Sequence, residues 1–211
     1  MRTLADEMVL LAFDEEGGKL PVRQALAPAV RGALLAELLD SGALADLAGT
    51  ARTAGGAPQD AVLRQVWQRI AAEPDRKWLH WVRKDGRESI REVLRGLEKD
   101  GLVEQSSSRV FGVFPLDRAG LTADGLAAAR EVRASVVAAA EGVAGSAAGG
   151  RDRAALLAGI AHAGGQLATA LPAGRRRALK DRLTVLSAEA APVSAAVERA
   201  VQDLQGAASS A

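Results

Sequence analysis

Cysteine and tyrosine are absent from this chain of 211 residues, and histidine occurs only twice. Without cysteine there are no disulfides, thiolate metal ligands or cysteine nucleophiles, which agrees with a reducing compartment such as the cytoplasm. The chain lacks a glycine-rich phosphate loop ending in Lys-Ser or Lys-Thr, and no His, Asp and Glu residues occur at metal-ligand spacing. His162 stands among alanines and His80 between two tryptophans, both typical of structural histidines. We therefore expect neither an enzyme nor a cofactor.

A strong net charge is also missing. The chain carries 27 basic and 26 acidic residues, so that any affinity for polyanions must come from local clusters. The run between Arg153 and Arg175 has no charge and is long enough to span a bilayer. It contains Gly164, Gly165 and Pro172, and we interpret it as a buried core helix. Acidic residues precede the first apolar run of the chain, which indicates a first helix rather than a secretory signal.

What the chain does have is apolar periodicity typical of helices. Hydrophobic residues make up 48% of it, and they recur at helical spacing in most segments. The sequence predicts a mainly α fold, a single compact multi-helix domain over residues 1–205 with a small β-hairpin and a disordered tail at 206–211. The expected helices are 4–13, one through Val30 and Leu38, one capped by Asp60, a short one with Trp78 and Trp81, then 88–99, 122–140, 152–168, 175–185 and 191–204. Residues 49–58 read as a loop, and the hairpin is predicted from strands 102–105 and 109–116 around Ser106–Ser108.

The most regular helix, 88–99, has arginines along one flank. Arg87, Arg91 and Arg95 recur every four residues, so that several guanidinium groups can meet one anion. Arginine presents a planar fork of donors suited to phosphate, and anions also favour a helix N-terminus. The alternative is a solvated helix flank, paired with acidic residues of the same helix, which are Glu88, Glu92 and Glu98.

Three sequence blocks, in a fixed order, cover most of the chain. They are LADEMVLLAFDEEGGKL followed by VRGALLAELLDSGAL, ESIREVLRGLEKDGLVEQ with RVFGVFPLD, and LLAGIAHAGGQLATAL. Through these blocks the chain resembles the Golgi phosphoprotein 3 family, as a bacterial-type member. The resemblance implies a helical peripheral membrane protein on cytosolic surfaces that recognises phosphatidylinositol 4-phosphate, or another anionic or phosphorylated lipid in a bacterial cell. Eukaryotic members also bind cytosolic tails of glycosyltransferases, so protein clients are possible.

The resemblance also implies a lipid headgroup site. The family pocket uses an arginine of an Arg-Gly pair in the second helix and two arginines at the start of the helix before the hairpin. Arg31 and Arg87 match two of these, whereas the third falls on Ile90, beside Arg91. An upstream tryptophan of the family falls near Val22, and its role passes to Trp78 or Trp81 if it is kept at all. The expected headgroup residues are Arg31, Arg87, Arg91 and Trp81.

The predicted hairpin has two interpretations. By the resemblance, it touches the membrane and mediates self-association into a homo-oligomer, with an apolar surface formed by Val110, Phe111, Val113 and Phe114. Alternatively, the phenylalanines close the core. Each basic residue near an anionic surface contributes only about 1 kcal/mol, and an inserted phenylalanine about 1.5 to 3 kcal/mol. Membrane binding would therefore need the hairpin and the arginine patch together.

A different class of function has the same outline. A helix, a short strand, a serine turn and a second strand also describe a winged-helix DNA-binding regulator, with residues 88–99 in the major groove and Ser106–Arg109 as the wing. Basic residues outnumber acidic ones only modestly in this region, and Glu88 and Glu92 would repel DNA phosphates. Nucleic acid is therefore the second choice of partner.

Overall fold

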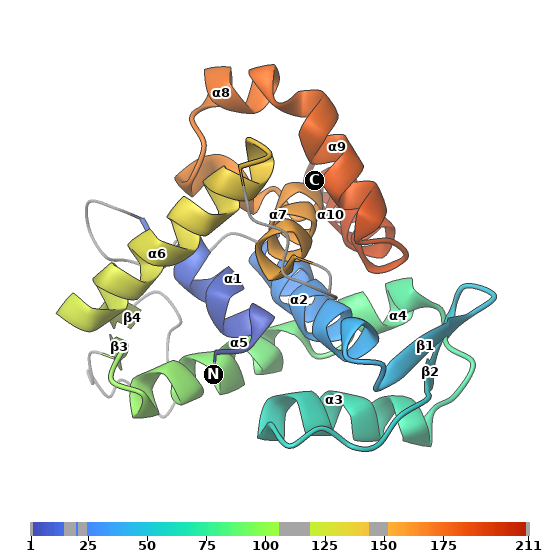
Figure 1. The fold of residues 1–211 in the computed structure, drawn as a ribbon. Helices are drawn as coiled ribbons and strands as arrows, with labels where there is room; N and C mark the ends of the chain where they lie inside the picture. The colour runs from blue at the N-terminus through green and yellow to red at the C-terminus, as the bar shows by residue number, and fades with distance from the viewer. Residues whose placement is uncertain (1, 15–19, 21–24, 106–118, 144–151, 210–211) are drawn as a thin grey trace.

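The segment from Leu26 to Asp40 is apolar on nearly all sides, which is typical of a helix buried all round. In the computed structural model of the chain, it forms helix α2 (Leu26–Asp40) and runs through the middle of the fold (Figure 1). The structure describes residues 2–14, 20, 25–105, 119–143 and 152–209. Helix α2 packs against α1 (Leu4–Ala12), α4 (Trp78–Arg83), α5 (Gly86–Lys99), α7 (Arg153–Ala163) and α10 (Val193–Ser209).

The other elements surround this bundle. They are β1 (Leu44–Leu47), β2 (Thr50–Thr53), α3 (Ala61–Ala72), β3 (Val103–Gln105), β4 (Ala119–Leu121), α6 (Ala123–Ala140), the 3-10 helix η2 (Gln166–Thr169), α8 (Ala173–Ala178) and α9 (Lys180–Glu189). A single cluster of buried apolar side chains extends from Leu4 to Val201. The expectation of a single, mainly α-helical domain with a small antiparallel hairpin is confirmed.

Two helix starts follow the capping signals in the sequence. The Asp6 amide donates to the Thr3 hydroxyl (3.1 Å) and the Thr3 amide donates to the Asp6 carboxylate (2.7 Å), a reciprocal capping box. Asp60 caps α3 by accepting from the Leu63 amide at 2.9 Å. Helices α1 and α3 therefore begin directly after Thr3 and Asp60, whose side chains accept hydrogen bonds from free amides of the first turn.

The glycine of the Arg-Gly pair in α2 lies where two other helices pack closely against it. A Cβ atom on Gly32 would lie 2.4 Å from Val197 Cγ2 of α10 and 3.2 Å from Ile160 Cγ2 of α7. Glycine lets these two helices approach the α2 backbone directly. The neighbouring Arg31 is also buried, where α2 meets α4 and α5.

The uncharged segment after Arg153 is a core helix, as expected, but a shorter one. Helix α7 ends at Ala163, Gly164 and Gly165 turn the chain, and η2 follows. Leu157 and Ile160 are fully buried. In the described part of the chain, no helix combines the length and hydropathy that crossing a bilayer requires.

Three other expectations are corrected. Residues 49–58 are not all loop, because Thr50–Thr53 forms β2 and pairs with β1 around a turn in which Ala48 and Gly49 both have positive φ. The helix expected at 175–185 is two helices, α8 and α9, that meet at Leu179. Helix α10 extends to Ser209, into the segment 206–211 that the sequence indicated as a tail.

Strand β3 also has a partner that the sequence did not predict. Strand β3 pairs antiparallel with β4, with Val103 opposite Leu121 and Gln105 opposite Ala119. The strand predicted at 109–116 lies outside the described residues. Figure 1 shows β3 and β4 side by side below the start of α6, at the far end of α5 from α4.

Candidate functional site

Arg31 occupies the junction of α2, α4 and α5. Its side chain is 1% exposed, so that the guanidinium group is removed from water. The Nε atom donates to the main-chain oxygen of Trp81 at 3.0 Å, and Nη1 donates to the Ser89 hydroxyl at 3.2 Å. Nη2 has no hydrogen-bond partner among the residues that the structure describes. A buried charged group with an unsatisfied donor is costly and rare in folded proteins.

Burial changes the protonation chemistry of this group. The pKa of Arg31 is lowered to about 10, mainly by desolvation and in smaller part by the positive charge of Arg69. The carboxylates of Asp85 and Glu88 act in the opposite direction. At neutral pH the guanidinium therefore stays charged, within a cluster of two arginines and two acids.

Arg69, from α3, holds the acidic side of this cluster. Its Nη2 and Nη1 donate to the two oxygens of Glu88 at 3.0 and 3.2 Å, a bidentate pair, and Nη1 lies 2.5 Å from Asp85 Oδ2. The hydrogen bond with Glu88 is the main cause that raises the pKa of Arg69, and the same bond lowers the pKa of Glu88. The side chains are 29% exposed for Arg69, 26% for Asp85 and 46% for Glu88.

The acidic pair surrounds the N-terminus of α5. Asp85, the residue before this helix, has a left-handed backbone (φ 59°) and caps no amide with its side chain. Gly86 is required here, because a Cβ atom would lie 2.9 Å from the Ala27 Cβ in the first turn of α2. The contact holds the start of α5 against α2 and places Ser89 within reach of Arg31. Free amides and the helix dipole make such an N-terminus attractive to anions.

The other expected arginines have a different environment. Arg87 and Arg91 are exposed on α5, and neither forms an ion pair with the part of the chain that is described. Arg95, the third of the stripe, pairs with Glu92 at 2.5 Å. Arg31 is therefore buried beneath the start of α5, whereas Arg87 and Arg91 lie on its outer flank.

Trp81 contributes its backbone rather than its ring. The indole is fully buried in the core, His80 packs edge-on at 4.9 Å, and the Lys84 ammonium lies 5.1 Å from the ring centre. The Trp81 carbonyl accepts the Arg31 Nε bond. Trp81 thus orients Arg31, and its ring is not an open wall for a ligand.

Comparison with known proteins decides the family. The family model described as Golgi phosphoprotein 3 (GPP34) matches residues 4–204, nearly the whole chain. The chain belongs to the Golgi phosphoprotein 3 family. The resemblance noted in the sequence is thereby confirmed. A search of curated proteins found no match.

For a Golgi phosphoprotein 3 family member, the site differs from the one that the sequence indicated. Sequence reasoning missed Arg69 and Asp85. The sequence has a turn signal at the Asp-Gly pair 85–86. Nothing in the sequence around Arg69 marks it as part of a site, because Arg69 approaches α5 from a separate helix. Ile90, on which the sequence resemblance placed the third arginine of the expected pocket, is a buried core residue.

The remaining expected site residues lie elsewhere. Phe111, Val113 and Phe114, expected at the membrane or in self-association, are outside the described residues. Within the described residues, no group of three or more His, Asp or Glu side chains is placed to hold a metal ion.

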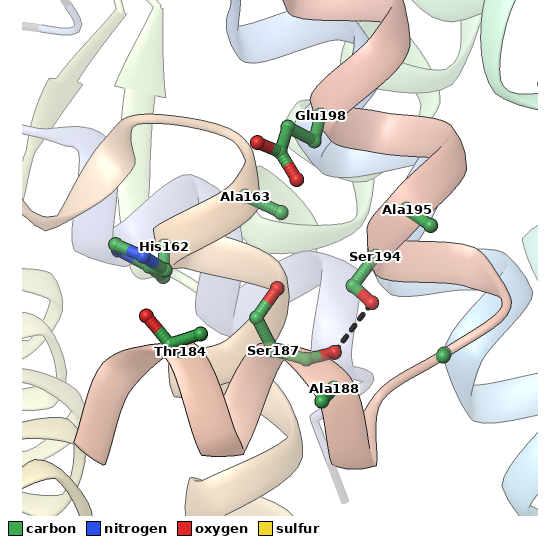
Figure 2. Close-up of a pocket in the computed structure, with 9 residues that line it drawn as sticks. His162, Ala163, Thr184, Ser187, Ala188, Ser194, Ala195 and Glu198 are labelled. Atoms are coloured by element: carbon green, nitrogen blue, oxygen red, sulfur yellow. Dashed lines mark hydrogen bonds between the residues drawn. The ribbon is translucent and has the colours of Figure 1, made fainter. Parts of the chain in front are cut away.

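A separate pocket of about 400 Å³ lies between α7, α9 and α10 (Figure 2). His162, Thr184, Ser187, Ser194 and Glu198 provide its polar lining. The Thr184 and Ser194 hydroxyls donate to main-chain oxygens of Lys180 and Ser187, so that both already have acceptors. Burial lowers the pKa of His162, which favours a neutral imidazole. The histidine lies in α7 as expected, but half buried at the pocket rather than packed in the core.

Proposed function

We propose that this protein is a cytoplasmic, peripherally membrane-associated lipid-binding protein. Its ligand is a phosphorylated or anionic lipid headgroup, such as that of phosphatidylinositol 4-phosphate, bound at the N-terminus of α5 by Arg31, Arg87 and Arg91. Membership of the Golgi phosphoprotein 3 family supports an adaptor of this kind rather than an enzyme.

The observation that carries the proposal is the unsatisfied Nη2 atom of Arg31. A structural arginine at 1% exposure would be expected to have an acceptor for each nitrogen, since the net cost of a missing one is about 1 to 3 kcal/mol, more for charged groups. A phosphate oxygen supplies both the acceptor and the counter-charge. The bonds to Trp81 and Ser89 meanwhile fix the direction of the guanidinium plane.

The surroundings favour an anion at the same place. The α5 N-terminus lacks a side-chain cap, and Arg87 stands in its first turn without an ion-pair partner among the described residues. Helix amides, Arg31 and Arg87 would then contact one phosphate from different sides.

The electrostatic attraction of the arginines is too weak to hold the protein on a membrane, so a second contact with the membrane is needed. Three arginines contribute about 1 kcal/mol each at an anionic surface, which corresponds to weak, millimolar-range attraction. The proposal therefore includes the segment with Phe111, Val113 and Phe114 as an apolar anchor, or as the contact between copies of a homo-oligomer that multiplies weak binding. Protein clients would be recruited by the membrane-bound form.

Co-flotation with lipid vesicles tests the function. We expect binding to phosphatidylcholine vesicles that contain phosphatidylinositol 4-phosphate, weaker binding to vesicles with phosphatidylserine, and none to phosphatidylcholine alone. The variant Arg31→Met, Arg87→Ala, Arg91→Ala should lose binding while its helical circular dichroism is unchanged. Methionine replaces the buried Arg31 because alanine would leave a cavity.

A charge-matched control separates the site from overall charge. Arg52, Arg175 and Arg199 are exposed and paired with acidic residues elsewhere, and their triple alanine variant removes the same charge. Unchanged binding by the site variant, or an equal loss in the control, would refute the proposed site. A salt titration with duplex DNA in place of vesicles tests the winged-helix alternative, whose expected wing lies outside the described residues.

A further inference from the structure

Arg69 is the most heavily paired arginine beside the proposed site. Three nitrogen-to-oxygen contacts of 2.5 to 3.2 Å join it to Asp85 and Glu88. Both acids act electrostatically on Arg31 as well, and so does Arg69. All four side chains therefore belong to one cluster, whose two positive and two negative charges cancel.

Because the charges of this cluster cancel, an incoming anion is not attracted by the cluster as a whole. A phosphate that reaches Arg31 approaches Asp85 and Glu88, which repel it, and Arg69, whose Nη1 and Nη2 atoms already contact these carboxylates. Arg31 itself is 1% exposed, whereas the paired groups around it are partly exposed. Some of the partly exposed side chains of Arg69, Asp85 and Glu88 must therefore move before a ligand can contact the buried guanidinium of Arg31.

Glu88 is the member best placed to leave. It is the most exposed of the three, at 46%, and its flexible side chain projects from the first turn of α5. Its carboxylate serves two purposes there, since it pairs with Arg69 in a bidentate fashion and puts negative charge at a helix N-terminus. A phosphomonoester dianion supplies two such oxygens and carries one more negative charge than the carboxylate.

We propose that Arg69 is a further anion-binding residue of this site, held by Glu88 in the free protein, and that a phosphomonoester dianion takes the place of Glu88. This inference rests on the proposed function. Binding then exchanges one Arg69 partner for another, and the affinity is reduced by whatever the Arg69–Glu88 pair contributes. Glu88 acts as an internal competitor that favours dianionic phosphate over singly charged headgroups.

A double-mutant cycle tests the exchange, with inorganic phosphate and phosphatidylinositol 4-phosphate vesicles as two separate probes. Glu88→Gln should bind about threefold to fivefold more tightly, because the pair is partly exposed. Arg69→Met should bind about tenfold more weakly. The double variant should match Arg69→Met, since the gain from Glu88→Gln requires a released Arg69.

Other outcomes overturn the inference. A gain from Glu88→Gln that persists in the Arg69→Met background would mean simple removal of negative charge, and so would an equal gain from Glu92→Gln, the control on the same helix that pairs with Arg95. No gain at all from Glu88→Gln, while the Arg31 variant still loses binding, refutes the exchange but keeps the proposed function. If the Arg31 variant keeps full binding, the proposed function itself fails. A response to vesicles but not to inorganic phosphate assigns the ligand to lipid.

Discussion

Arg31 and Arg153 both join helices that are distant in sequence, and their bonding differs. Arg153 donates through every nitrogen: Nε to both oxygens of Glu7 at 3.3 Å, Nη1 to Glu37 at 3.3 Å, and Nη2 to the main-chain oxygen of Arg2 at 2.7 Å. Its side chain is 31% exposed. Arg31 is far more buried, yet the described residues offer it neutral acceptors on two nitrogens and none on the third.

This difference separates a structural arginine from one suited to a ligand. The carboxylates near Arg153 bind it directly, whereas those near Arg31 are bound to Arg69 instead. Water can reach part of Arg153, but it cannot complete the bonding of Arg31. An arrangement that leaves a buried charge incompletely bonded costs stability, and binding an anion would recover that cost.

The largest expected contrast comes from replacing each arginine by methionine. Arg153→Met should lower the free energy of unfolding by about 1 to 2 kcal/mol, because Glu7 and Glu37 lose their common partner, and should leave vesicle binding intact. Arg31→Met should remain within about 1 kcal/mol of the original stability, since an apolar side chain replaces a poorly compensated buried charge. Its vesicle binding should nevertheless be lost.

Urea unfolding and co-flotation measure both properties on the same two variants. The contrast would be broken by a stability loss in Arg31→Met as large as that of Arg153→Met. Arg31 would then be a structural arginine like its counterpart.

A smaller effect is expected from the glycine that sets the position of α5. Gly86→Ala should push the helix start away from Ala27 and lengthen the 3.2 Å contact between Ser89 and Arg31. We expect vesicle binding several-fold weaker and stability lower by about 1 kcal/mol. The control is Gly96→Ala on the same helix, where a Cβ atom meets nothing within 4 Å.

The control should change in the opposite direction. Alanine at position 96 should raise the free energy of unfolding by about 0.5 to 1 kcal/mol through helix propensity and leave binding unchanged. Equal binding by both glycine variants would show that the alignment of α5 with Arg31 is unimportant.

The sequence predicted the helices that carry these arginines but not the tertiary contacts that the arginines make. The helix predicted at 88–99 is found as α5, with its start two residues earlier, and Thr3 begins the first helix, because spacing and capping are local properties. The family resemblance directed attention to Arg31. The role of Arg69 could not be read from the chain, since its contact with Glu88 exists only after α3 and α5 pack together. The hairpin β1–β2 was missed because its strands contain alanine, leucine and polar residues rather than an alternating β-branched pattern.

The burial of Arg31 was equally hidden. Arg31 was expected in a lipid headgroup site together with Arg87 and Arg91. Glycine at 32 instead admits α7 and α10 to the backbone of α2, and the neighbouring side chain is enclosed by α4 and α5. Close helix approach is a property of packing, which periodicity does not encode.

The smallest expected effect is on the pH dependence of stability, which should differ between the acidic residue beside Arg153 and the one beside Arg69. Burial raises the pKa of Glu7 above its usual 4.5, although Arg153 opposes the change, whereas the hydrogen bond from Arg69 lowers the pKa of Glu88 below 4.5. The contribution of Glu7 to stability is therefore present below pH 4.5 and lost as the pH rises through its folded value. That of Glu88 is present above pH 4.5 and lost as the pH falls through its folded value. The measurement is the urea midpoint of unfolding as a function of pH. Glu7→Gln should reduce the change of the midpoint with pH above pH 4.5, and Glu88→Gln should reduce the change below pH 4.5. If both variants change the midpoint on the same side of pH 4.5, the side chains around Arg31 and those around Arg153 are electrostatically alike. The distinction between a satisfied and an unsatisfied arginine then loses its support.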